Sequence, residues 1–208
     1  MTQQIMASIL VLDIGNVICE WNSEALVASA FVNPADHAQA LQATVGHPDW
    51  IELDRGTLAL EQAISQAQKR SGLDADSIAA IYHKLPASLT ILPSTVSAMQ
   101  EAKAAGVPMY ILSNMHSHSW DYLQANHECF SWCDGAAVSC EAKAVKPEEA
   151  IYRYLCECYS LNPADCVFID DMAVNIEAAR AFSMGGVQLT DRLQGGELIR
   201  SLLAELTT

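Results

Sequence analysis

Residues 8–17 read SILVLDIGNV, and this stretch decides the fold. Five mostly apolar residues precede Asp13, the first charged residue of the chain, and a Gly-Asn step follows it. A continuous apolar run that ends in turn residues is typical of a strand buried on both faces of a parallel sheet. Ligands of open α/β sheets bind at the carboxyl ends of such strands, so Asp13 has the position of a nucleophile or a metal ligand. The alternative is a capping residue of the next helix, where aspartate is common.

The composition describes an acidic chain with enough apolar residues for a full core. Of its 208 residues 51% are hydrophobic, and 25 acidic against 11 basic side chains give a formal net charge of −14. This length fits one domain, or one domain with an inserted module. The negative charge argues against nucleic acid and anionic membranes as partners. The net negative charge does not exclude an anionic small molecule as substrate, because a local cation can outweigh the electrostatic field of the whole chain.

The seven cysteines predict a reduced, cytoplasmic protein, because their number is odd and several fall in apolar segments. His127, Cys129 and Cys133 could suggest zinc, but the sequence has no Cys-x-x-Cys pair, and buried free cysteine is the favoured interpretation. We expect no secretory signal, because the first ten residues carry no lysine or arginine. No segment approaches the roughly 20 apolar residues that span a bilayer.

The sequence pattern changes after residue 17. From Ser23 to about Leu85 it is alanine-rich and helical, which predicts a small helical module. Beyond Pro93, predicted strands at 107–112, 135–139, 166–169 and 185–189 alternate with helices at 93–104, 120–126, from Pro147, 175–181 and 197–206. This alternation predicts an α/β fold with a doubly wound parallel sheet. The predicted domains are a core of residues 1–17 and 88–208 and an inserted α-helical cap of residues 18–87.

Polar residues with possible chemistry follow three of the predicted strands. They are Asp13, Ser113-Asn114 and Asp170-Asp171. Pro147 is expected to occupy the first position of a helix, and Lys146 directly precedes it. The helix dipole disfavours a cation at a helix N-terminus, which favours a functional role for Lys146. Because the carboxyl ends of parallel strands meet in one crevice, we expect all these groups to converge. Close carboxylates repel one another, so a divalent ion such as Mg²⁺ is expected between them.

This set of groups suits phosphoryl transfer. Asp13 could attack phosphorus in line and form an aspartyl-phosphate. Lys146 and the metal ion would neutralise the charge of the phosphate. Ser113 and the backbone amides after Asp13 would hold its equatorial oxygens.

Four motifs in this order resemble those of the haloacid dehalogenase (HAD) superfamily of hydrolases, and the resemblance covers essentially the whole chain. They are LDIGNV at 12–17, ILSN at 111–114, VKP at 145–147 with Ile151-Tyr152, and FIDD at 168–171 with Asn175-Ile176. The first motif, taken with residues 50–56 of the cap, is similar to the α-D-glucose-1-phosphate phosphatase subgroup. The resemblance implies that Asp13 and Lys146 are catalytic residues. It implies that the phosphate is bound by Ser113, Asn114 and Lys146. It also implies that Mg²⁺ is held by Asp13, the Gly15 carbonyl, Asp170 and Asp171.

Gly15 departs from the pattern of most phosphatases in this superfamily. They carry a second aspartate at this position, which acts as general acid and then base, and such help is worth about 10²–10⁴-fold. The glucose-1-phosphate phosphatase subgroup also has glycine here. The enzyme would then depend on good leaving groups, a substituted group or water. His116 and His118 follow the second motif and are candidates for a substitute proton donor, although solvated histidine is the commoner case.

We therefore predict a Mg²⁺-dependent phosphatase that hydrolyses a small phosphorylated metabolite, with a sugar phosphate as the expected substrate. A 2-haloacid dehalogenase is one alternative, because a halide leaves without a proton; the dehalogenases have Ser and Asn in place of Asp170-Asp171. A catalytically weak binding protein on the same fold is the other.

Four residues are candidates for the substrate-facing side of the cap: Trp21, Asn22, Trp50 and Arg55. Packing within the cap is the alternative for Trp50, since large aromatic rings contribute most to cores. Asn175 could orient the metal-binding loop or lie on the surface of its helix. The sequence leaves monomer and homodimer open.

Overall fold

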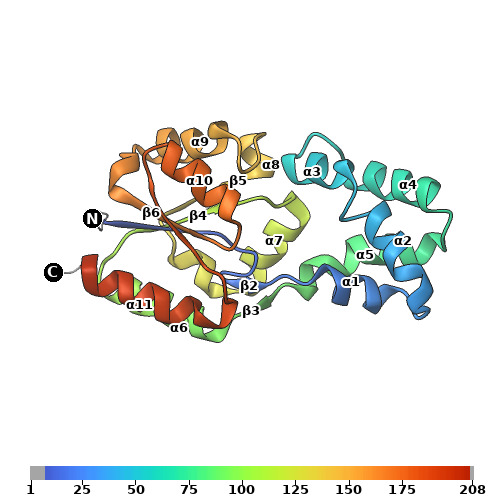
Figure 1. The fold of residues 1–208 in the computed structure, drawn as a ribbon, viewed down its shortest axis with the longest axis horizontal. Coiled ribbons are helices and arrows are strands. Elements are labelled where there is room, and N and C mark those ends of the chain that lie inside the picture. Colours follow the sequence, from blue (N-terminus) through green and yellow to red (C-terminus); the bar gives the residue numbers. More distant parts are fainter. Residues whose placement is uncertain (1–7, 207–208) are drawn as a thin grey trace.

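The computed structural model describes residues 8–206, and a five-stranded parallel sheet with the order β5-β4-β1-β6-β7 lies at its centre. The strands are β1 (Ile9–Leu12), β4 (Met109–Ser113), β5 (Gly135–Val138), β6 (Cys166–Asp170) and β7 (Gly185–Gln188). Helices cover both faces of the sheet (Figure 1): α6 (Pro93–Ala104) and α11 (Gly195–Leu206) on one, α9 (Glu149–Tyr159) and α10 (Ala173–Ala181) on the other. The predicted doubly wound α/β fold is confirmed.

The central strand β1 is buried because both of its neighbours and both of its faces are occupied. It pairs in parallel with β4 and with β6. Leu10 and Leu12 pack in the core cluster that includes residues of α6 and α11, and Val11 packs in the cluster that includes α9 and α10. Successive side chains of a strand point to opposite faces. The continuous apolar run of residues 9–12 therefore supplies both layers at once.

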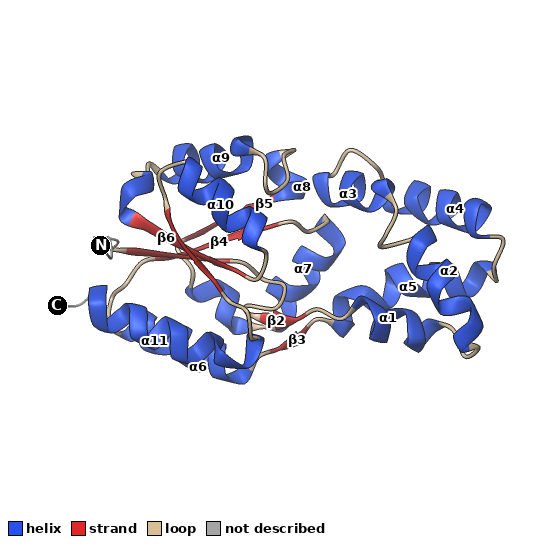
Figure 2. Ribbon diagram, viewed as in Figure 1, coloured by secondary structure: helices blue, strands red, loops and turns tan. Residues whose placement is uncertain are grey.

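A helical cap lies beyond the carboxyl end of β1. Its helices are α1 (Ser23–Ala30), α2 (His37–Ala43), α3 (Pro48–Arg55), α4 (Leu60–Ser71) and α5 (Ala75–Ser88). The chain enters the cap through β2 (Cys19–Glu20) and returns through β3 (Thr90–Ile91), which pair antiparallel to each other (Figure 2). The cap also contacts the core directly, because α3 lies on α8 (Ser139–Ala142) and α5 lies on α7 (Ser117–Asn126). Of the helices in residues 8–206, none has the length and apolar character needed to cross a membrane.

The division into core and cap at residues 17/18 and 87/88 stays a prediction, and residues 1–7, 207 and 208 of the predicted core lie outside the described residues. Some element boundaries differ from those predicted. Glu148 donates its backbone N–H to the Val145 carbonyl at 2.8 Å, which closes a turn around the cis Lys146-Pro147 peptide, so α9 begins at Glu149. The expected lead position of Pro147 in this helix was wrong.

Helix α3 begins at Pro48, directly after Gly46-His47. The His47 ring caps α3 by accepting a hydrogen bond from the backbone N–H of Asp49 at 3.2 Å, and Pro48 takes the first position, where it costs no hydrogen bond. Helix α5 runs beyond Tyr82 to Ser88. The two strands that connect cap and core, β2 and β3, have two residues each and are too short to show a sequence pattern.

Candidate active site

The carboxyl ends of β1, β4 and β6 bring three polar side chains together. Leu12 is paired with Ile111 on one side and with Ile169 on the other. The next residue, Asp13, donates its backbone N–H to the Ile169 carbonyl at 3.0 Å. The hydroxyl of Ser113 forms a hydrogen bond with the carboxylate of Asp13. Parallel register alone therefore places the ends of the first, second and fourth motifs side by side.

Lys146 links two of these carboxylates. Its Nζ lies 2.8 Å from Oδ1 of Asp13 and 2.6 Å from Oδ2 of Asp170. The side chains of Lys146, Asp13 and Asp170 are 2%, 10% and 0% exposed, so the charges interact with little screening by water. Burial lowers the pKa of Lys146, but the two carboxylates outweigh it and the net shift is upward. Lys146 is therefore a cation held against the carboxylate of Asp13.

Asp170 is held in place from two directions. Nδ2 of Asn175 lies 3.0 Å from each of its carboxylate oxygens, and the backbone N–H of Met172 donates to Oδ1 at 2.7 Å. Asn175 is itself buried, and its carbonyl accepts a hydrogen bond from the hydroxyl of Tyr152 at 2.9 Å. Of the two interpretations of Asn175, these contacts support the one in which it orients the acidic loop.

Asn16 makes a corresponding contact with Asp171. Its Nδ2 donates to Oδ2 of Asp171 at 2.9 Å, and its Oδ1 accepts the backbone N–H of Trp21 at 3.1 Å. The residue adopts a left-handed backbone with φ 55°, which asparagine tolerates better than most residues. Burial raises the pKa of Asp171, and the hydrogen bond from Asn16 opposes that rise. The sequence motif contains Asn16, but its spacing from Asp171 gave no sign of this contact.

The carboxylates fit a divalent cation. Asp13, Asp170 and Asp171 each offer an oxygen, and these oxygens lie within 4.8 Å of one another. Burial raises the pKa of Asp13, while Lys146 opposes the rise. One ammonium group against three carboxylates leaves excess negative charge in a buried place, and oxygen donors of this kind are those that Mg²⁺ prefers. Gly15 lines the same cavity.

Asn114 binds the backbone of the loop that carries Lys146. Its Oδ1 accepts the N–H of Lys146 at 2.7 Å, and its Nδ2 donates to the Lys146 carbonyl at 3.0 Å. This pair of hydrogen bonds joins the end of β4 to the third motif across 32 residues of sequence. The contacts support a positioning role for Asn114, and its contact with phosphate stays a prediction.

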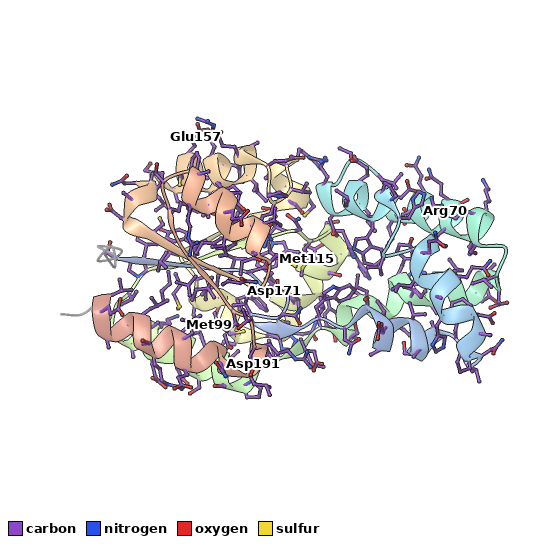
Figure 3. The ribbon with its side chains drawn as sticks, viewed as in Figure 1. Arg70, Met99, Met115, Glu157, Asp171 and Asp191 are labelled. Atoms are coloured by element: carbon purple, nitrogen blue, oxygen red, sulfur yellow. The ribbon has the colours of Figure 1, made fainter. Side chains whose placement is uncertain are left out.

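A cavity of about 300 Å³ lies between the core and the cap above Asp13. Figure 3 shows Asp171 and Met115 in the region where the two parts meet, and both line this cavity. Trp21 and Trp50 line it as well, with their ring centroids 6.2 Å apart. Many of the side chains that line the cavity are apolar: Trp21, Val45, Trp50, Leu85, Leu89, Met115 and Met172.

Two of the four predicted cap residues are engaged elsewhere. The side chain of Asn22 caps α1 by accepting the backbone N–H of Ala25 at 2.9 Å. Arg55 forms a two-pronged contact with Glu148 of the core, at 2.7 and 2.8 Å. Neither residue lines the cavity in the described part of the chain. The prediction that Asn22 and Arg55 bind the substrate is not supported by these hydrogen bonds.

Replacement of Arg55 by alanine is expected to raise KM by no more than about fivefold. The Arg55 and Glu148 side chains are 20% and 44% exposed, and pairs of this kind contribute about 0.2–1 kcal/mol, which corresponds to that limit. Steady-state kinetics of Arg55→Ala, Glu148→Ala and the double variant provide the measurement. The double variant should match either single one, because all three lose the same contact between cap and core. A tenfold or larger rise confined to the Arg55 variants would instead indicate direct contact with the substrate phosphate.

The two histidines after the second motif lie in different places. His116 is buried and lines the cavity, and its ring interacts with the hydroxyl of Ser119 at 3.2 Å. Burial, with a smaller contribution from His118, lowers the pKa of His116 to about 4. A neutral ring at neutral pH is a poor proton donor, so these features do not support the suggested role. His118 lines a second hollow at the contact between α3 and α8.

Sequence reasoning passed over two further residues at this site, Asp54 and Ser139. Asp54 lines the cavity from α3. The Ser139 hydroxyl accepts the backbone N–H of Met115 at 2.8 Å and donates to the backbone carbonyl of Asp54 at 2.6 Å. The available signal for Asp54 was its spacing of four residues from Trp50, which places both on one helix face.

A family model described as haloacid dehalogenase-like hydrolase matches residues 7–183. The chain therefore belongs to this family, and it is a hydrolase; the predicted resemblance to the HAD superfamily is confirmed. A sesquiterpene phosphatase of Aspergillus oryzae is 25% identical over 193 residues, which are 93% of this chain and 95% of the fungal protein. A drimenol cyclase of Aspergillus calidoustus is 25% identical over 185 residues, which are 88% of this chain and 34% of that protein.

Solved structures share the fold. A HAD family enzyme of Bacteroides thetaiotaomicron, in complex with magnesium and inorganic phosphate, has a TM-score of 0.70 at 18% identity over 88% of this chain and 93% of that one. The L-2-haloacid dehalogenase of Xanthobacter autotrophicus has a TM-score of 0.67 at 18% identity over 97% and 84%. A likeness at this level of identity shows the fold alone, so the side chains of the site must indicate the reaction.

Proposed function

We propose that the protein is a Mg²⁺-dependent phosphatase that hydrolyses a small phosphate monoester through an aspartyl-phosphate on Asp13. The observation that carries the proposal is the buried cluster in which Lys146 lies against Asp13 and Asp170, with Asp171 close by. The fungal relative that is named a phosphatase supports the same reaction class.

The chain's own residues divide the work. Asp13 is the nucleophile, and its Oδ1 is oriented by the backbone N–H of Ile14 at 2.7 Å. Lys146 holds positive charge next to the position of the incoming phosphate, and Ser113 is placed to donate to a phosphate oxygen. Asp13, the Gly15 carbonyl, Asp170 and Asp171 are the proposed ligands of Mg²⁺. When bound, Mg²⁺ supplies further positive charge to the transferring phosphoryl group.

The second acid of the Asp170-Asp171 pair favours a phosphatase over a dehalogenase. A halide leaves as a stable anion and needs no metal, whereas a dianionic phosphate group requires concentrated positive charge. Here each acid of the pair has its own amide partner, Asn175 for Asp170 and Asn16 for Asp171. Two carboxylates kept in place in this way support a metal-binding role.

For the alcohol part of the substrate, the cavity wall favours an apolar group. Two tryptophans, two leucines, two methionines and a valine line the cavity. The name of the Aspergillus oryzae relative, a sesquiterpene phosphatase, supports the same chemistry. The sugar phosphate that follows from the resemblance to the glucose-1-phosphate phosphatase subgroup stays the second candidate, because Asn16, Asp54 and Ser119 give the wall polar groups as well.

A substrate panel with and without Mg²⁺ tests both parts of the proposal. We expect hydrolysis of p-nitrophenyl phosphate and octyl phosphate with Mg²⁺, and loss of both activities in EDTA. For octyl phosphate, kcat/KM should exceed that for glucose 1-phosphate by at least about tenfold, since two buried methylenes at about 0.8 kcal/mol each suffice. The opposite order would favour the sugar phosphate. Release of chloride from 2-chloropropionate without metal, together with no phosphate release, would establish the dehalogenase alternative.

The cytoplasmic location predicted from composition is also part of this proposal. All seven cysteines are free, and most are buried. Free thiols are typical of reducing compartments.

A further inference from the structure

We propose that Asp54, a residue of the cap, is the general acid and base of this reaction and takes the role of the side chain that Gly15 lacks. The inference rests on the proposed phosphatase function. It concerns the fate of the proton, whereas the proposed function concerns attack on phosphorus.

The fold brings Asp54 of the cap and Asp13 of the core to the wall of one cavity. Asp54 lies one helical turn after Trp50 on α3, and both line the cavity that Asp13 lines from the core. Residues four apart share a helix face, so the burial of Trp50 directs Asp54 to the same side. The hydroxyl of Ser139 donates to the Asp54 carbonyl at 2.6 Å, which fixes this end of α3 against the core. Asp54 is thus presented from the side where the alcohol part of a substrate would lie.

The carboxyl group of Asp54 has the surroundings of a proton carrier. It accepts a hydrogen bond from the backbone N–H of His116. Among residues 8–206 no lysine or arginine forms an ion pair with it: the adjacent Arg55 contacts Glu52 and Glu148, and Lys146 contacts Asp13 and Asp170. A charged carboxylate without a cation is disfavoured in a desolvated wall, so the protonated form gains weight.

The pKa of Asp54 agrees with this placement. Burial raises it from 3.8 to about 7, and the hydrogen bond from His116 reduces the rise only in part. A general acid and base works best when its pKa lies near the working pH, because both forms are then available. The His116 ring in the same wall, with its pKa lowered to about 4, lacks this property.

The two steps balance with one proton carrier. In the first, a carboxylate oxygen of Asp13 bonds to phosphorus, the bond from phosphorus to the ester oxygen breaks, and the Asp54 carboxylic acid gives its proton to the departing alcohol. In the second, the Asp54 carboxylate takes a proton from water as the water oxygen bonds to phosphorus and the bond from Asp13 to phosphorus breaks. The products are the alcohol and inorganic phosphate, and both aspartates return to their starting forms.

The test is Asp54→Asn on the full chain with Mg²⁺, assayed with octyl phosphate and with p-nitrophenyl phosphate. Asparagine keeps the shape and the oxygen that accepts from His116, but it carries no exchangeable acid. We expect kcat/KM for octyl phosphate to fall by about 10²–10⁴-fold. For p-nitrophenyl phosphate, kcat/KM should change less than about threefold, because p-nitrophenolate leaves without a proton. Its kcat should fall with a burst of p-nitrophenol, since water then lacks a base.

A second variant asks whether the missing acid can be restored from the core. A Cβ at Gly15 would meet Trp21 Cβ at 3.7 Å, an ordinary contact, so an aspartate can be introduced there. Gly15→Asp in the Asp54→Asn background should restore at least about tenfold of the lost kcat/KM for octyl phosphate. The same substitution should leave kcat/KM for p-nitrophenyl phosphate nearly unchanged, and it should raise kcat for that substrate, because the new carboxylate can take the proton from water.

Glu52→Gln is the matched control, because it removes an exposed carboxylate from the same helix; it should leave kcat/KM for both substrates unchanged. An equal fall in kcat/KM for both substrates in Asp54→Asn would overturn the role of Asp54 and leave the proposed function intact. Unchanged hydrolysis of octyl phosphate would overturn it as well. A wild-type protein that cleaves no phosphate ester with Mg²⁺ would overturn the proposed function and this inference with it.

Discussion

Substitution of Asp13 by asparagine is expected to lower kcat by on the order of 10⁴-fold or more for every phosphate ester that the protein cleaves. Asparagine has the same shape and can still accept the backbone N–H of Ile14, but its neutral amide is a very poor nucleophile. Loss of a nucleophile typically removes nearly all of the rate that depends on its partners. Lys146 keeps its contact with Asp170, so we expect the variant to fold.

Two measurements check this prediction. The first is steady-state phosphate release, and the second is trapping of radiolabelled phosphoenzyme by acid quench, which should succeed in wild type and fail in Asp13→Asn. Glu157→Gln is a suitable control, because Glu157 lies on the exposed side of α9, away from the site (Figure 3). Phosphoenzyme in the Asp13 variant would show that another residue is the nucleophile.

Lys146→Met is expected to affect both stability and activity. It leaves two buried carboxylates, Asp13 and Asp170, without their shared cation. Removal of one partner from a buried ion pair costs about 3–5 kcal/mol, so the free energy of unfolding should fall by that amount in EDTA. Loss of one charge at the phosphate should lower kcat by about 10²–10³-fold.

Urea unfolding in EDTA and in Mg²⁺ measures the stability effect. A divalent cation on the same carboxylates should return part of the lost free energy, and the gain from Mg²⁺ should be larger in Lys146→Met than in wild type. Lys103→Met removes an exposed lysine and should change neither quantity. Unchanged stability of Lys146→Met in EDTA would contradict a structural contribution of this cation.

The convergence of the core residues was predictable because a parallel sheet allows few arrangements. Once the apolar runs before Asp13, Ser113 and Asp170 are interpreted as adjacent strands, their carboxyl ends must share one edge. The prediction that Lys146 belongs to the site used the dipole of a helix expected to start at Pro147, but no helix starts there. The place of Lys146 depends instead on the two hydrogen bonds between its backbone and Asn114, a contact between distant segments that has no local sequence pattern.

The cap could not be interpreted with the same precision. The sequence predicts that Arg55 faces the substrate, but its neighbour Asp54 lines the cavity and Arg55 contacts Glu148. Successive residues of a helix point about 100° apart, so a shift of one position exchanges the two environments. The rotation of α3 about its axis is set by Trp50 and Leu53, which are buried, and the sequence pattern does not fix this rotation.

The thin connection between the two parts, made by β2 and β3, has a consequence for inheritance within the family. The insert between these strands can diverge as a unit, because it joins the core through two short strands and through contacts of α3 and α5 with the core helices α8 and α7. If the proton carrier belongs to the insert, then recruitment of a new cap changes the range of ester bonds that can be broken together with the molecules that are admitted. The kinds of leaving group that the enzyme can protonate and the substrates that it admits would then evolve together. With an acid at position 15 of the core, the two properties would evolve separately.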